Sequence, residues 1–243
     1  MPILLTEPAL QGGLGLVAAF IDIPEDDSLA DPTVTALGYI RTGNESEIGF
    51  GAHSGNAMDG ALRYMAALGG GSINLDFYLG DEEKPVSLNN EALFAHVEAQ
   101  YQLGDSRFFF GPSATWINTT ISPNESGAPG YVSQEVTLAA LGLSLHYDTR
   151  DNRFTPRDGI NARVSYERFD ESWGSDAEYN TYGAFGAWFH SPNDAWTLSA
   201  MADHRAVDGG APFFVEPSIN LRGVPLNRYQ GQDVVSAEIE VRR

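Results

Sequence analysis

Oxygen-bearing side chains gather in one short segment of the chain, and their types suggest two kinds of chemistry. Asp148, Asp151 and Asn152 stand around Arg150 in a stretch that follows an alternating apolar segment. Carboxylate and amide oxygens bind Ca²⁺, but the spacing does not follow that of an EF-hand loop. The same side chains close turns by accepting hydrogen bonds from backbone N–H groups. The segment therefore predicts a charged turn, with a calcium site as the alternative.

Three other patterns have weaker support as chemical sites. Gly104-Asp105-Ser106 is similar to an esterase nucleophile segment, but it lies in an expected hairpin turn with no placed histidine partner. Gly13-Leu14-Gly15-Leu16-Val17-Ala18 fits a dinucleotide-binding G-x-G-x-x-A, but no helical pattern follows it. The histidines do not form a pair at metal-ligand spacing: His53, His96, His146, His190 and His204. We therefore expect no catalytic residue, no metal and no cofactor, and the chain is not expected to be an enzyme.

A further candidate is the Arg-Gly step Leu221-Arg222-Gly223, which lies in a long loop with proline and glycine. Arg222 is either an ordinary solvated loop arginine or an arginine with a fixed acidic partner. The segment after the loop carries Glu238 and Glu240 on one face of an alternating pattern. Which reading holds depends on the elements that position these residues.

Those elements are strands, because apolar and polar residues alternate with a period of two. In 234–242 the apolar positions are Val235, Ala237, Ile239 and Val241, while the positions between them are polar or charged. The same alternation is present in 91–103, 106–117, 135–147, 160–167 and 195–205. A polar face that recurs along many strands requires water on that side. The apolar face then requires lipid or a second sheet.

Further strands are expected at 12–21, 34–42, 46–54, 60–68, 72–80 and 178–190, which makes about twelve in all. Short connections are expected near 43–45, 69–71, 104–105 and 191–194. Longer ones are expected near 22–33, 81–90, 118–134, 169–177 and 208–232. Short turns at one rim and long loops at the other are typical of an antiparallel transmembrane β-barrel. A soluble β-sandwich is the alternative.

Composition narrows the class of protein further. The 243 residues carry a net charge of −19, which argues against a nucleic-acid partner. No apolar run is long enough for a transmembrane helix. The start has no signal-peptide pattern, and the last strand ends in mid-pattern at Arg243. We therefore expect residues 1–243 to be a single incomplete barrel domain, truncated at both ends.

Two motifs resemble one known family. The run from Leu143 to Gly159, including Asp148, Arg150, Asp151, Asn152, Pro156 and Gly159, resembles the strand-turn signature "YDTRDN" followed by proline and glycine. That signature belongs to the BamA/TamA outer-membrane family, also called the bacterial surface antigen family. The run 220–231 resembles the Arg-Gly loop of the same family. The opening residues 6–15 look like the first barrel strand of its short members without POTRA repeats.

The resemblance implies a barrel of sixteen strands in which the Arg-Gly loop joins the eleventh and twelfth. The alternating pattern independently puts 208–232 between the eleventh and twelfth expected strands, so the last four strands would be missing. The resemblance also implies that the loop enters the lumen, where Arg222 pairs with acidic groups and Gly223 allows close approach. Glu238 and Glu240 are its candidate local partners.

The implied function is the insertion, assembly or translocation of proteins at the bacterial outer membrane, without catalysis. Its partners would be outer-membrane lipid and unfolded outer-membrane or secreted proteins. The family works through a weak seam between first and last strands, and an expected first strand with Gly12, Gly13 and Gly15 would weaken pairing there. A passive channel or surface antigen on the same scaffold is the alternative. A soluble β-rich binding module or hydrolase is the third possibility.

Overall fold

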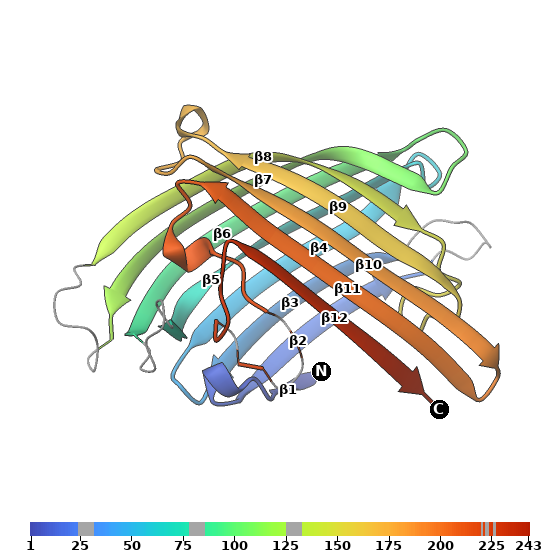
Figure 1. Ribbon diagram of the computed structural model, residues 1–243, viewed down its shortest axis with the longest axis horizontal. Coiled ribbons are helices and arrows are strands. Elements are labelled where there is room, and N and C mark those ends of the chain that lie inside the picture. Colours follow the sequence, from blue (N-terminus) through green and yellow to red (C-terminus); the bar gives the residue numbers. More distant parts are fainter. Residues whose placement is uncertain (24–31, 78–85, 125–132, 220, 222–223, 226) are drawn as a thin grey trace.

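The computed structural model describes residues 1–23, 32–77, 86–124, 133–219, 221, 224–225 and 227–243. These residues form twelve antiparallel strands in one sheet, whose order follows the chain (Figure 1). The strands are β1 (Pro2–Leu5), β2 (Gly13–Asp22), β3 (Thr33–Thr42), β4 (Glu47–Ala57), β5 (Leu62–Phe77), β6 (Val86–Gln102), β7 (Phe108–Pro123), β8 (Gln134–Asp148), β9 (Gly159–Phe169), β10 (Tyr179–Asn193), β11 (Trp196–Gly209) and β12 (Asp233–Arg242). The all-β architecture predicted from the period-two pattern is confirmed.

In the described parts of the links there are three short 3₁₀ segments, namely η1 (Pro8–Leu10), η2 (Glu171–Trp173) and η3 (Phe213–Val215). No helix among the described residues has the length and apolarity needed to cross a membrane. The sheet is strongly curved and forms part of a barrel wall (Figure 1). Each strand pairs with its neighbours in the sequence, and no pairing joins β1 to β12 within the described part of the chain. The sheet is therefore an open, partial barrel.

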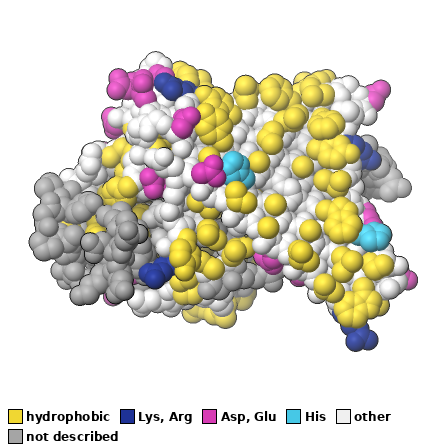
Figure 2. Space-filling model, viewed as in Figure 1, with side chains coloured by type: hydrophobic (Ala, Val, Ile, Leu, Met, Phe, Trp, Pro, Cys, Tyr) yellow, Lys and Arg dark blue, Asp and Glu magenta, His cyan; other side chains and the backbone are white. Residues whose placement is uncertain are grey.

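The two faces of the sheet differ as the alternation predicted. On the outer face of β12, Ile239 is 82% exposed, and apolar side chains on the neighbouring strands are exposed too. Figure 2 shows apolar side chains spread over the strands in view. On the opposite, lumen face, Ser144 of β8 is buried between Gly111 of β7 and Ser165 of β9, its partners in the register. A continuous exposed apolar face of this kind requires an apolar surrounding such as lipid.

The turn predicted at 69–71 was wrong, because β5 runs unbroken through these three glycines. A Cβ atom on Gly69 would lie 2.5 Å from the ring of Phe94, and one on Gly70 would lie 2.5 Å from Leu93. A Cβ on Gly71 would overlap the carbonyl of Glu47 in β4. The glycines thus let β4 and β6 approach β5 closely, which is the role of glycine inside a strand.

The first strand was also predicted wrongly. Residues 2–5 form β1 and pair with β2, so Gly13 and Gly15 lie in the second strand, between β1 and β3. Gly12 precedes that strand in a left-handed conformation with φ of 72°. The expected weakening of a first strand by these glycines therefore does not apply. The split of β5 and the missed β1 compensate, which is why the count of twelve was still right.

These two corrections change which links share a rim. Strict alternation puts the links 23–32, 58–61, 103–107, 149–158 and 194–195 at one end of the sheet, here called the turn rim. The links 6–12, 43–46, 78–85, 124–133, 170–178 and 210–232 share the other end, here called the loop rim. The links 22–33 and 43–45 had been expected at the opposite rims. The long 210–232 link remains on the rim with most of the longer loops.

Candidate functional site: the lumen loop and the charged turn

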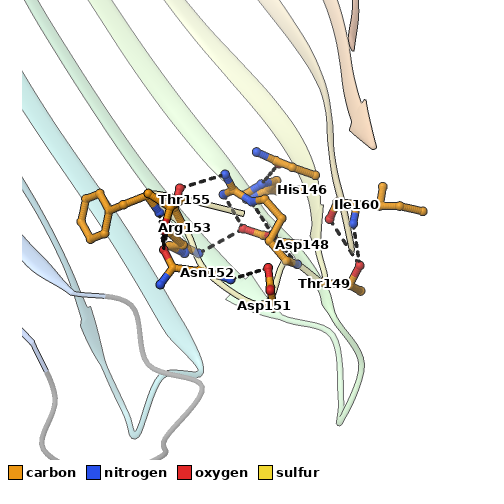
Figure 3. A network of polar contacts seen from close by, with 11 residues as sticks. His146, Asp148, Thr149, Asp151, Asn152, Arg153, Thr155 and Ile160 are labelled. Atoms are coloured by element: carbon orange, nitrogen blue, oxygen red, sulfur yellow. Dashed lines mark hydrogen bonds and ion pairs between the residues drawn. The ribbon is translucent and has the colours of Figure 1, made fainter. Parts of the chain in front are cut away.

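The charged turn at 149–158 is built around Asp148, the last residue of β8. One Asp148 oxygen accepts hydrogen bonds from the backbone N and Nε of Arg150 at 3.1 and 3.0 Å, and the other accepts from its Nη2 at 2.8 Å. The Nη2 of Arg153 lies 3.6 Å from the same carboxylate. Figure 3 shows Asp148 and Arg153 within this network of polar contacts. Because the Asp148 side chain is only 5% exposed, it is a buried carboxylate held by two arginines.

The next two residues of the motif organise the backbone of the turn. Asp151 Oδ1 accepts from the N–H groups of Asn152, Arg157 and Asp158 at 2.9, 2.9 and 3.2 Å. Asn152 Oδ1 accepts from two further backbone N–H groups at 2.9 Å. Burial raises the pKa of Asp151, but the backbone N–H groups lower it more strongly, so the net pKa lies below its ordinary value.

Pro156 and Gly159 complete the turn and attach it to its neighbours. Gly159 has φ of 116°, and a Cβ there would overlap the carbonyl of Thr149, so only glycine fits. The Pro156 carbonyl accepts a hydrogen bond from Arg242 Nη2 of β12 at 3.0 Å. The Arg157 guanidinium donates to the carbonyl of Asn193 at 2.9 Å, in the β10–β11 hairpin. The motif therefore ties three parts of the turn rim together.

In these contacts the side-chain oxygen atoms of Asp148, Asp151 and Asn152 accept hydrogen bonds from groups of the turn itself. No group of three or more histidine or acidic side chains placed to hold a metal ion occurs in the described ranges. The charged-turn interpretation of 148–152 accounts for the observed contacts.

The second part of the site is the 210–232 link, here called the lumen loop. Its first part is an apolar segment on the lumen face, here called the root, which includes Phe213 and Phe214. Phe213 of η3 meets the ring of Phe77 edge-on, with the centroids 5.5 Å apart. Phe214 packs against two separate buried clusters. One consists of Phe77, Leu88 and Ile121, and the other of Val136, Leu138, Ala140, Phe169 and Tyr179. The root therefore bridges strands from β5 to β10 near the loop rim.

Sequence reasoning missed this root. The signal was the apolar run from Ala211 to Val215 inside a segment expected to be a solvated loop. Loops on a surface seldom carry two adjacent phenylalanines without a place to bury them. The wall positions that pack against the root are apolar, whereas polar residues were expected on the lumen face. This difference was a second signal.

Beyond the root, the link folds back on itself as a narrow stem. Ser218 pairs with Gln230 in an isolated antiparallel bridge, and Ile219 N donates to the Tyr229 carbonyl at 3.0 Å. Gly231 N donates to the carbonyl of Pro217 at 3.1 Å.

Leu221, which follows this stem, is a described residue of the Arg-Gly motif and lies at the lumen wall. Leu221 and Glu238 line one cavity of about 200 Å³, together with Asp203 and Arg205 of β11. Arg205 Nε and Asp203 Oδ1 form an ion pair at 2.7 Å on this wall. Glu240 follows at the next lumen-facing position of β12. The structure thus brings Leu221 and Glu238 together.

Arg222 and Gly223 lie outside the described residues, so their predicted pairing with Glu238 and Glu240 stays a prediction. The neighbouring residue Val224 is described and half-buried. What the structure adds is the path of the loop, from an aromatic root through a paired stem to the wall beside Glu238.

The comparisons with known proteins agree with this geometry. Residues 42–212 match the Omp85 superfamily domain. Among solved structures, the crystal structure of BamA from Haemophilus ducreyi lacking POTRA domains 1–3 is similar in fold, with a TM-score of 0.61 and 12% sequence identity. The similarity covers 95% of this chain and 49% of that one, so the chain spans about half the length of the solved relative. No curated protein matches the chain.

The family match covers most of the chain, and it includes the whole charged turn. The structural match independently supports one curved, antiparallel sheet of barrel type. The resemblance found in the two motifs is therefore confirmed: the chain belongs to the Omp85 superfamily and forms a partial barrel of the BamA/TamA type.

Proposed function

We propose that this protein resides in the bacterial outer membrane and assists the insertion or assembly of other proteins there, without catalysing a chemical reaction. The observation that carries the proposal is a long loop rooted on the lumen wall of a curved sheet whose outer face is apolar. Membership of the Omp85 superfamily supports the same role. The partners would be outer-membrane lipid and unfolded outer-membrane or secreted proteins.

The proposal predicts an effect on the folding of a second protein. The purified chain is reconstituted in liposomes, and a small unfolded outer-membrane barrel is added as the client. We expect the client to reach its heat-resistant gel mobility several-fold faster than in liposomes that hold an equal amount of the chain added after heat denaturation. Equal rates in both preparations would contradict an insertion role.

A second candidate function, a passive channel, is favoured by the polar lumen wall and by the loop that lies against it. Current through the protein in planar bilayers distinguishes the two. A conductance that rises when Arg222 is replaced by alanine would indicate a pore that the loop plugs. Insertion activity together with an unchanged conductance would instead favour the first candidate.

A further inference from the structure

The charged turn at 149–158 does more than close the β8–β9 hairpin, because it reaches a strand that is not its neighbour in the sheet. The Pro156 carbonyl accepts its hydrogen bond from Arg242 of β12, three strands beyond β9. Arg242 alternates with Glu240 and Glu238 on the lumen face of β12. The turn therefore crosses β10 and β11 on the inner side of the wall.

Between these two ends, the turn is attached to the β10–β11 hairpin. The Arg157 guanidinium donates to the Asn193 carbonyl at 2.9 Å, and the Arg157 carbonyl accepts from Ser191 Oγ at 3.1 Å. Ser191 Oγ and Thr197 Oγ1 share a hydrogen bond of 2.9 Å. Thr197 lies directly opposite Arg242 in the β11–β12 register. A continuous line of contacts therefore joins the turn to β10, β11 and β12.

Hydrogen bonds inside the turn make it a stiff connection. Asp151 Oδ1 accepts from three backbone N–H groups of the turn, and Asn152 Oδ1 accepts from two more. At the β9 end, Asp158 Oδ1 accepts from the backbone N of Ser191 at 3.3 Å and lies 3.0 Å from His190 Nδ1. Because its backbone is held from within, the turn transmits a displacement at one end to the other.

Hydrogen bonds between neighbouring strands do not by themselves fix the curvature of the wall. The twist between adjacent strands varies from about 10° to about 35°, so the three steps from β9 to β12 permit a wide range of angles. With strands about 4.8 Å apart, these steps place β12 roughly 14 Å from β9 along the sheet. A contact that bypasses β10 and β11 restricts this range, since it fixes a chord of the curved wall (Figure 1).

We propose that the charged turn is a strap that holds the turn-rim end of β12 inward and thereby sets how widely the wall opens at this rim. Release of Arg157 and Arg242 from their contacts lets the wall from β9 to β12 flatten. The β11–β12 ladder stays intact in this motion, because the strap contacts β12 through a side chain. The inference concerns the shape of the wall, so it holds whichever candidate function is right.

The test is a distance measurement between spin labels, since the chain has no cysteine and introduced cysteines are labelled uniquely. The first pair is Asp105→Cys in the 103–107 link and Ile239→Cys on the outer face of β12, both at exposed positions. Pulsed electron paramagnetic resonance of the 243-residue chain in detergent micelles gives the distance distribution. In Arg157→Ala and in Arg242→Ala we expect longer distances and a distribution about twofold broader, because each strand step then varies in twist.

Two controls separate release of the strap from a general loosening of the wall. A second label pair at the loop rim, Glu135→Cys on β8 with Val235→Cys on β12, should keep its distance in the same variants, because the strap acts at the other rim. Arg41→Ala removes an arginine that pairs with Glu47 at 3.4 Å at the loop rim. It should leave the distance of the turn-rim pair unchanged.

Heat-modifiable gel mobility establishes that each variant is folded. Arg242→Lys, which keeps the charge but loses the planar donor group, serves if Arg242→Ala does not fold. An unchanged turn-rim distance in the folded variants of Arg157 and Arg242 would overturn the proposal. So would an equal change in the loop-rim pair or in Arg41→Ala, since the wall would then have loosened as a whole.

Discussion

Gly159 shows how a single residue holds the charged turn in shape. With φ of 116° and the Thr149 carbonyl where a side chain would begin, it has no substitute. We expect Gly159→Ala to lower the free energy of unfolding by about 1–3 kcal/mol, the usual cost of such backbone strain. Urea titration in detergent micelles measures this. Gly186→Ala is the control, since no atom lies within 4 Å of the added Cβ, and an equal loss there would refute the explanation.

Asp151 is a second single residue with a predictable effect, because its contribution to the stability of the folded protein depends on pH. Its pKa in the folded protein is lowered, so its stabilising effect is complete above the unfolded pKa of about 3.9 and is lost as pH falls through the folded value. We expect the thermal unfolding temperature of the unmodified chain to decrease when the pH is lowered below about 4. Asp151→Asn, which keeps the acceptor oxygen, should show a smaller fall.

The control for this experiment is Asp105→Asn, which removes an exposed charge from another link of the turn rim. If Asp105→Asn reduced the acid dependence as much as Asp151→Asn, general charge repulsion would be responsible. The three backbone hydrogen bonds to Asp151 would then have no special role.

At the scale of elements, the prediction concerns the root of the lumen loop, which attaches the loop to the wall. Phe214 is half-buried between the two lumen clusters, so Phe214→Ala should cost about 1–3 kcal/mol, less than for a fully buried phenylalanine. Loss of the root should free the stem, and trypsin should cleave after Arg228 faster than in the unmodified chain. Phe154→Ala, at a side chain 61% exposed on the turn rim, should leave the cleavage rate unchanged. Unchanged cleavage in Phe214→Ala would show that the root does not hold the loop.

Much of the strand pattern could be predicted from the sequence, because lipid and water impose opposite polarity on alternate residues. The triplet Gly69-Gly70-Gly71 could not be read correctly, since glycine permits both a tight turn and close approach between strands. The contact of Phe213 with Phe77 joins residues far apart in the chain, and no local pattern encodes such a partner. The Asp148–Arg150 pair is local, which is why the turn was predictable.

On the scale of the whole molecule, the strand order has a consequence for how the protein folds. Each strand pairs with its neighbour in the sequence, so the sheet can grow by successive hairpins with short loop closures. The root of the lumen loop is different, because its two clusters draw residues from β5 to β10. It can dock only after those strands have assembled. Docking of Phe213 and Phe214 is therefore a late kinetic step, and an unfolded loop root would mark an unfinished barrel wall.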